Sequence, residues 1–145
     1  MSGILGTKAP LLYDLNFILQ IAIVFLISVS YLLKRKKKYV KHGAIMTSAV
    51  IVHTALILFV MGPSFIIHFG SLVSLPINLG IIVTWIHAFL GIISMILGVF
   101  IVTKWNFRNP TRLTCIQRKK WMKPTMITWV IALILGIGFY IFYYL

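Results

Sequence analysis

Four long apolar runs divide the chain, and basic or weakly polar segments separate them. The runs cover residues 15–33, 43–61, 79–103 and 125–145. A helix needs about 20 apolar residues to cross the hydrocarbon core of a bilayer, and each run meets that length. A membrane β-barrel would require alternating segments of about 10 residues, which the sequence lacks. The pattern therefore predicts an all-α integral membrane protein, a four-transmembrane-helix bundle forming a single domain over residues 1–145.

The basic residues predict how these helices are oriented. Every Lys and Arg except Lys8 lies in residues 34–41, between the first two helices, or in residues 104–123, between the last two. Cytoplasmic loops of membrane proteins are enriched in Lys and Arg in this way. We therefore expect both loops on the inner side of the cell membrane and both termini on the outer face.

The composition agrees with a bilayer as the surrounding medium. Hydrophobic residues make up 61% of the chain and the mean hydropathy is +1.04, whereas soluble domains are roughly 45–50% apolar. Because the net charge of +13 lies at helix ends, it favours membrane orientation, and nucleic acid is not expected as a partner.

The first run lacks a cleavage site and a basic leader, so we expect it to stay as a helix. Cys115 is alone and is expected to be an ordinary loop residue.

The segment at residues 62–78 is the least ordinary part of the pattern. It carries no formal charge, yet it is neither polar enough for a solvated loop nor long enough for a further span. Since Gly and Pro interrupt it, we expect an outer loop that folds back against the surface. Small residues elsewhere predict close helix packing, namely Gly91, Ser94, Gly98, Gly136 and Gly138.

Two histidines fall inside predicted helices, where ionisable residues are costly and usually functional. His53 and His87 each lie roughly 12–14 Å below the outer surface at 1.5 Å per residue, so antiparallel helices would hold them at one level. Two facing imidazoles suit a haem b or a metal such as copper. They equally suit two helices bridged by hydrogen bonds, because two histidines fall short of a complete metal shell. Both interpretations remain open from the sequence.

Three other polar residues are candidates for supporting roles. His68 lies in the segment that is expected to fold back, where it is a candidate third metal ligand. His42 lies about 16 Å from His53 along one helix, so it cannot share an ion with His53 and is expected at the inner interface. Asp14 is expected to cap the first helix; pairing with Lys8 and orienting a histidine are the alternatives.

Several short motifs together resemble a known family. They are LGTKAPLLYDLNF before the first helix, YVKHGAIM entering the second, WIHAFLG in the third, and WMKP and GFYIFYY around the fourth. The combination resembles the prokaryotic four-helix membrane family called domain of unknown function 420, which includes cytochrome oxidase maturation factors. The resemblance covers nearly the whole chain. It implies a role near haem- and copper-containing oxidases, with His42, His53 and His87 at histidine positions of the family pattern. Where a histidine is expected before the fourth helix, this chain has Cys115 and Gln117.

No nucleophile constellation, carboxylate pair or phosphate loop is present in the sequence, so no catalytic residues are expected. The leading hypothesis is a non-catalytic accessory or structural subunit, or a maturation factor, of a membrane-bound metallo-oxidase complex. That complex would be of the haem–copper respiratory or copper monooxygenase type, and its other integral subunits would be the partners. The alternatives are a small haem b electron-transfer protein with His53 and His87 as ligands, and a copper-handling protein that adds His68 and Met61.

Overall fold

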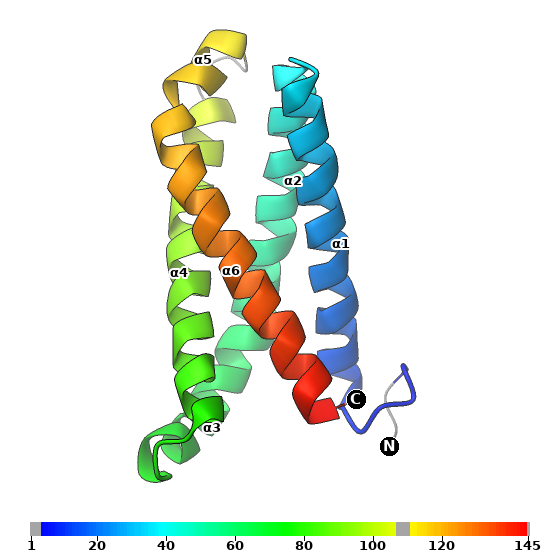
Figure 1. Ribbon diagram of the computed structural model, residues 1–145, viewed down its shortest axis with the longest axis vertical. Helices are drawn as coiled ribbons and strands as arrows, with labels where there is room; N and C mark the ends of the chain where they lie inside the picture. Colours follow the sequence, from blue (N-terminus) through cyan, green and yellow to red (C-terminus); the bar gives the residue numbers. More distant parts are fainter. Residues whose placement is uncertain (1–3, 107–110, 145) are drawn as a thin grey trace.

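Four long helices make up the computed structural model of the chain, which describes residues 4–106 and 111–144 (Figure 1). All four are long and apolar enough to cross a membrane, with mean hydropathies of 2.2 to 2.3. The predicted class, an all-α protein with four candidate membrane spans, is confirmed. The long helices and their parts are α1 (Leu11–Arg35), α2 (Tyr39–Leu56), the π-helical turn η1 (Ile57–Met61), α3 (Gly62–Ser74), α4 (Leu79–Asn106) and α6 (Lys119–Tyr144).

The prediction of a loop at residues 62–78 is wrong, because residues 62–74 are helical. α2, η1 and α3 form one unbroken helix over residues 39–74. Pro63 lies in the first turn of α3, where the change of hydrogen-bond register in η1 accommodates a residue that has no N–H. Instead of folding back, α3 leads directly to α4: Phe65 and Phe69 contact Trp85, with ring centroids 5.3 and 6.0 Å apart.

The segment between the last two long helices is also more ordered than a loop. α5 (Arg112–Gln117) is a short helix that begins with a reciprocal hydrogen-bonded cap between Thr111 and Thr114. α6 then starts at Lys119, earlier than predicted, and contains Pro124. Residues 107–110 of the predicted loop lie outside the described part of the chain.

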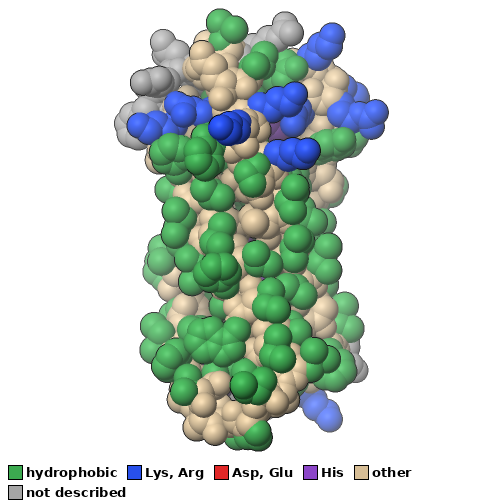
Figure 2. All heavy atoms as spheres, turned by 60° about the vertical axis from the view of Figure 1, so that its left-hand side comes forward, with side chains coloured by type: hydrophobic (Ala, Val, Ile, Leu, Met, Phe, Trp, Pro, Cys, Tyr) green, Lys and Arg blue, Asp and Glu red, His purple; other side chains and the backbone are tan. Residues whose placement is uncertain are grey.

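The long helices are arranged as two pairs, α1 with α2 and α4 with α6 (Figure 1). The pairs meet through α2 and α4, and α6 crosses from α4 at one end of the molecule to α1 at the other. We call the end that holds residues 34–41 and 111–123 the basic end, and the opposite one the terminal end. Figure 2 shows Lys and Arg gathered in a belt at one end and hydrophobic side chains along the shaft. A shaft with an apolar outer surface is what lipid contact requires.

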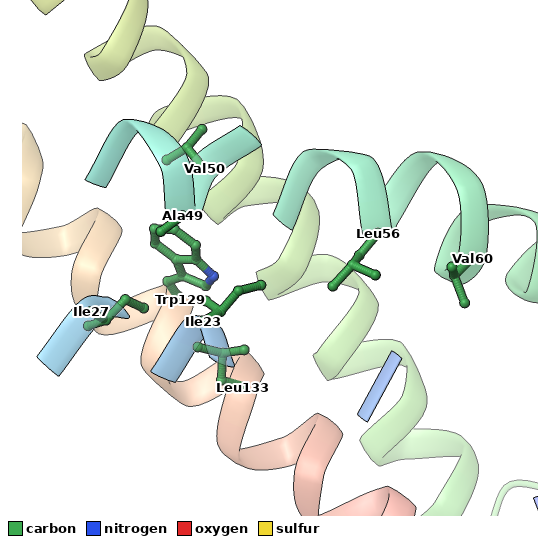
Figure 3. Packing of buried hydrophobic residues seen from close by; sticks show 8 residues of the cluster. All are labelled: Ile23, Ile27, Ala49, Val50, Leu56, Val60, Trp129 and Leu133. Atoms are coloured by element: carbon green, nitrogen blue, oxygen red, sulfur yellow. The ribbon is translucent and has the colours of Figure 1, made fainter. Parts of the chain in front are cut away.

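A compact apolar cluster joins α1, α2 and α6 where the pairs meet (Figure 3). Trp129 of α6 is its largest member and is 1% exposed. Small residues allow the backbones to approach: a Cβ on Gly98 of α4 would lie 3.2 Å from a methyl of Val50. The predicted packing role does not extend to Gly138, which is exposed and has open space beside it. The cluster consists of Ile23, Ile27, Ala49, Val50, Leu56, Val60, Trp129 and Leu133.

Candidate functional site

Polar side chains from all four long helices meet in the interior, beside the apolar cluster. His53 of α2 is 4% exposed and packs its ring on Trp129 of α6, with centroids 5.0 Å apart. His53 also lies close enough to His87 of α4 for an electrostatic interaction. Gln20 of α1, which is 4% exposed, completes the group. We call His53, His87, Gln20 and Trp129 the interior polar cluster.

His87 has a fixed orientation within this cluster. Its Nδ1 lies 2.9 Å from the backbone carbonyl of Ala132 and donates to it, because a carbonyl can only accept. That bond leaves Nε2 as the lone-pair nitrogen. Gly136 makes room for the contact, since a Cβ there would lie 2.7 Å from His87 Cε1 and 2.8 Å from Gln20 Oε1. The missing side chain at Gly136 therefore leaves space for His87 and Gln20 inside the bundle.

Several buried polar atoms of the cluster have no hydrogen-bond partner among residues 4–106 and 111–144. They are both ring nitrogens of His53, Oε1 of Gln20 and Nε1 of Trp129. Burying a polar group without a partner costs roughly 1–3 kcal/mol, so such groups are rare in folded proteins and usually mark a ligand, ion or functional role. Four such atoms on three neighbouring side chains make this cluster the chemically most distinctive part of the interior.

The donor set fits a small ion better than a haem. His87 and the Gln20 carbonyl oxygen both lie beside Gly136, and His53 lies within electrostatic reach of His87. Imidazole nitrogens with an amide oxygen suit a late first-row metal such as copper or zinc. A haem needs in addition an apolar slot for its macrocycle. The pocket at the basic end, whose lining includes His42, does not include His53 or His87 in that lining.

His68 does not join the two interior histidines. It lies on the exposed surface of α3, as part of the helix that replaces the expected loop. No group of three or more His, Cys, Asp or Glu side chains in the described parts of the chain is placed to hold a metal ion. Met61, the candidate sulfur donor, packs against the apolar cluster and lies about 12 Å along the helix from His53. The expected ligand set of His53, His87, His68 and Met61 is therefore not assembled.

His42 is buried between helices, with 7% of its surface exposed. Its Nδ1 lies 2.9 Å from the Ser30 carbonyl and 2.6 Å from the Ser30 hydroxyl, and that hydroxyl donates to the His42 carbonyl at 3.1 Å. These bonds tie α2 to α1 near the basic end. His42 thus has a defined partner, unlike His53.

Asp14 does not cap α1, because the helix begins after Pro10 without a side-chain cap. The carboxylate is fully buried and accepts hydrogen bonds from the Leu5 N–H at 3.0 Å, from the Thr7 hydroxyl at 2.9 Å and from the Tyr140 hydroxyl. It therefore attaches the segment before α1 to the end of α6, and it contacts neither Lys8 nor a histidine through the bonds described.

Sequence reasoning missed Gln20 and Trp129. The signal for Gln20 was present, since an amide in the middle of an apolar run is as unusual as a histidine and needs a partner there. Trp129 gave no signal, because tryptophan in a membrane helix is expected at an interface and only the tertiary contact with His53 reveals its position.

The fold and this interior cluster define a multi-pass membrane protein with four candidate spans, a buried His53 and a half-buried His87 beside it. No protein-family model, curated protein or solved structure matches the chain.

Proposed function

We propose that this protein is a non-catalytic accessory component of a membrane-bound metallo-oxidase complex, as a subunit or a maturation factor. The observation that carries the proposal is the buried His53 beside His87, with neither nitrogen of His53 bonded to a described residue. The resemblance to the family of oxidase maturation factors supports the same assignment. In this proposal the basic loops face the cytoplasm and both termini lie on the outer face, as the distribution of Lys and Arg favours.

The test is to purify the tagged protein from its native membrane in mild detergent and identify what copurifies. We expect polypeptides of a haem- or copper-containing oxidase, and a lower content of assembled oxidase when the protein is deleted. A deletion strain with unchanged oxidase assembly and activity, together with a native protein that copurifies with no oxidase polypeptide, would refute the proposal.

A second candidate function is copper handling, which the donor set of the interior polar cluster favours. A copper(I) ion accepts two imidazole nitrogens, and His87 Nε2 and a nitrogen of His53 are the atoms left for it. The protein would then hold the ion within the membrane for transfer. In this proposal Gln20 Oε1 is a neutral oxygen donor beside the two nitrogens.

Copper binding is tested by loading the purified protein with copper(I) and measuring the bound metal after desalting. We expect about one copper per chain, loss of at least about tenfold in affinity in His53→Ala and His87→Ala, and no change in the exposed control His68→Ala. Copper retained equally by all four proteins would contradict this site. A reducible haem absorption that disappears in His53→Ala would instead establish the electron-transfer alternative.

A further inference from the structure

A cavity lies at the basic end, between the two helix pairs. It has a volume of about 570 Å³, within the range of roughly 300–1,000 Å³ that small-molecule sites occupy. All four long helices and α5 contribute to its lining. It shares only Trp129 with the interior polar cluster. Because Trp129 is 1% exposed, whereas Lys119, Lys120 and Lys123 are exposed, we take Trp129 as the deep end of the pocket and the lysines as its mouth.

The mouth of this pocket is basic and has no counter-charge in the protein. Lys34 of α1 and Lys119, Lys120 and Lys123 of α6 line it. Asp14 is the only acidic residue of the sequence and lies in the first turns of α1, at the terminal end. The lysines therefore have no carboxylate side chain at their own end with which to pair. Lys34 is half-buried and lies near enough to His42 and Cys115 for electrostatic interaction, so positive charge reaches into the mouth.

The interior of the pocket is apolar and has room for a chain. Three methionines line it, Met46, Met122 and Met126, and unbranched Met side chains adapt to flexible apolar ligands. From Lys119 at the mouth to Trp129 at the deep end, α6 advances by about 15 Å. This depth accommodates a large part of an acyl chain.

The unpaired polar atoms of the lining are hydrogen-bond donors. The indole N–H of Trp105, which lies beside Gly43 near the basic end, is buried and has no acceptor in the described parts of the chain, and Trp105 lines the pocket. Indole and lysine can donate but not accept. A ligand that satisfies them must carry acceptor oxygens, as phosphate and ester groups do.

We propose that this pocket binds an anionic phospholipid, with its phosphate among the four lysines and one acyl chain extending toward Trp129. Basic pockets between transmembrane helices are known to bind anionic headgroups in this way. A zwitterionic lipid is disfavoured, because the basic end has no carboxylate side chain to receive its cation. The proposal depends only on the four helices lying in a bilayer, and not on the proposed oxidase role.

The test is native mass spectrometry of the full-length protein in detergent, with phosphatidylglycerol and phosphatidylcholine of identical acyl chains. We expect phosphatidylglycerol to bind at least about tenfold more tightly, since each lysine contributes to the attraction. Equal binding of the two lipids by the wild-type protein would overturn the proposal, whatever the variants do. Displacement of phosphatidylglycerol by inorganic phosphate would overturn it too, because the site would then be one for a free anion.

Two matched pairs of variants separate the pocket from general surface charge. Lys119→Gln/Lys120→Gln/Lys123→Gln should lower phosphatidylglycerol affinity at least about tenfold. Lys36→Gln/Lys37→Gln/Lys38→Gln removes the same charge from residues outside the pocket lining and should lower the affinity by no more than about twofold. Met126→Trp should fill the pocket and abolish retention, whereas Ile131→Trp, outside the lining, should not. Equal losses in the two triple variants, or retention by Met126→Trp, would contradict a pocket-bound lipid.

Discussion

Asp14 is the residue through which the N-terminal segment is attached to the last helix. The Thr7 and Tyr140 hydroxyls donate to one carboxylate oxygen of Asp14, and the Leu5 N–H donates to the other. Asp14→Asn removes the negative charge and replaces one acceptor oxygen with an NH₂ group, so every remaining bond is one between neutral groups and is weaker. We expect faster tryptic cleavage after Lys8, which is exposed just before α1, and a lower thermal midpoint in detergent.

Two variants of neighbouring residues serve as comparisons for Asp14→Asn. Tyr140→Phe removes one of the three donors and leaves two, so it should lower the thermal midpoint and speed the cleavage less than Asp14→Asn does. Ser64→Ala removes a bond to the Tyr13 hydroxyl of 2.7 Å between α3 and α1 but leaves the Asp14 bonds intact. It should leave the cleavage rate after Lys8 unchanged. A normal cleavage rate in Asp14→Asn would show that the carboxylate does not hold the segment.

Cys115, at the basic end, has a thiol whose pKa can be measured through its rate of alkylation. Burial raises the pKa of this thiol above its ordinary value, and nearby Lys34 lowers it by less. A raised pKa means that the thiolate forms only at higher pH, so the rate of alkylation should rise with a midpoint above the value of about 8.5 for a free cysteine.

Lys34→Gln should move this midpoint further upward, because it removes the positive charge that favours the thiolate. Lys36→Gln is the control and should leave the midpoint in place, because Lys34 is the lysine whose charge acts on the Cys115 thiol. The pH dependence of the alkylation rate constant is the measurement. A midpoint at or below that of a free cysteine would contradict the buried, neutral thiol.

The sequence predicted the depth of a residue along a helix, because the rise per residue alone decides it. His53 and His87 were expected at one depth from helical rise, and the structure brings them within electrostatic reach. Partners were less predictable, because they depend on which helix faces which. Ser30 for His42 and Tyr140 for Asp14 come from distant turns or from the other end of the chain, and no local spacing indicates either contact.

Among the elements, η1 is the one whose geometry departs from a regular helix. It begins one turn after His53, at Ile57, and is followed by Gly62, where a Cβ would lie 2.8 Å from the Ile57 carbonyl oxygen. π-helical turns often occur beside functional sites. Glycine at residue 62 is therefore what allows the wider turn to close.

Gly62→Ala should destabilise the protein by about 1–3 kcal/mol, because a methyl group against a backbone oxygen forces the turn to shift. The matched control is Gly70→Ala in α3, where a Cβ meets nothing within 4 Å; it should be neutral or slightly stabilising, since alanine favours helix. Thermal unfolding in detergent and the fluorescence of Trp85, which α3 contacts, are the measurements. Equal stability of the two variants would show that η1 does not require glycine.

The sequence predicted which segments are helices but not where they end. Hydropathy identifies a span because the apolar run must match the bilayer, and all four spans were found. Gly and Pro were interpreted as ending helices, yet Pro63 and Pro124 both lie within helical segments. Proline rules are derived largely from exposed helices in water, and membrane helices tolerate proline because neighbouring groups satisfy the freed backbone.

At the scale of the whole molecule, the crossing of α6 determines where each site lies. It contacts α1 at the terminal end, through Tyr140 and Asp14, and α4 along its length. The interior polar cluster lies where the two pairs of helices meet. The pocket lies toward the basic end, where its lining is shared among α1, α2, α4, α5 and α6. The interior polar cluster and the pocket are therefore separate parts of the interior that share only Trp129.

Thiol labelling tests which end of the bundle faces the cytoplasm. In a Cys115→Ser background, Ser71→Cys places a thiol on the exposed surface of α3 and Lys36→Cys places one in the turn between α1 and α2. Because cytoplasmic loops carry the excess of Lys and Arg, an impermeant reagent should label Ser71→Cys in intact cells and Lys36→Cys only after permeabilisation. The reverse pattern would invert the proposed topology and place the lipid pocket in the outer leaflet. Labelling of both from outside would mean that residues 39–74 do not cross the membrane.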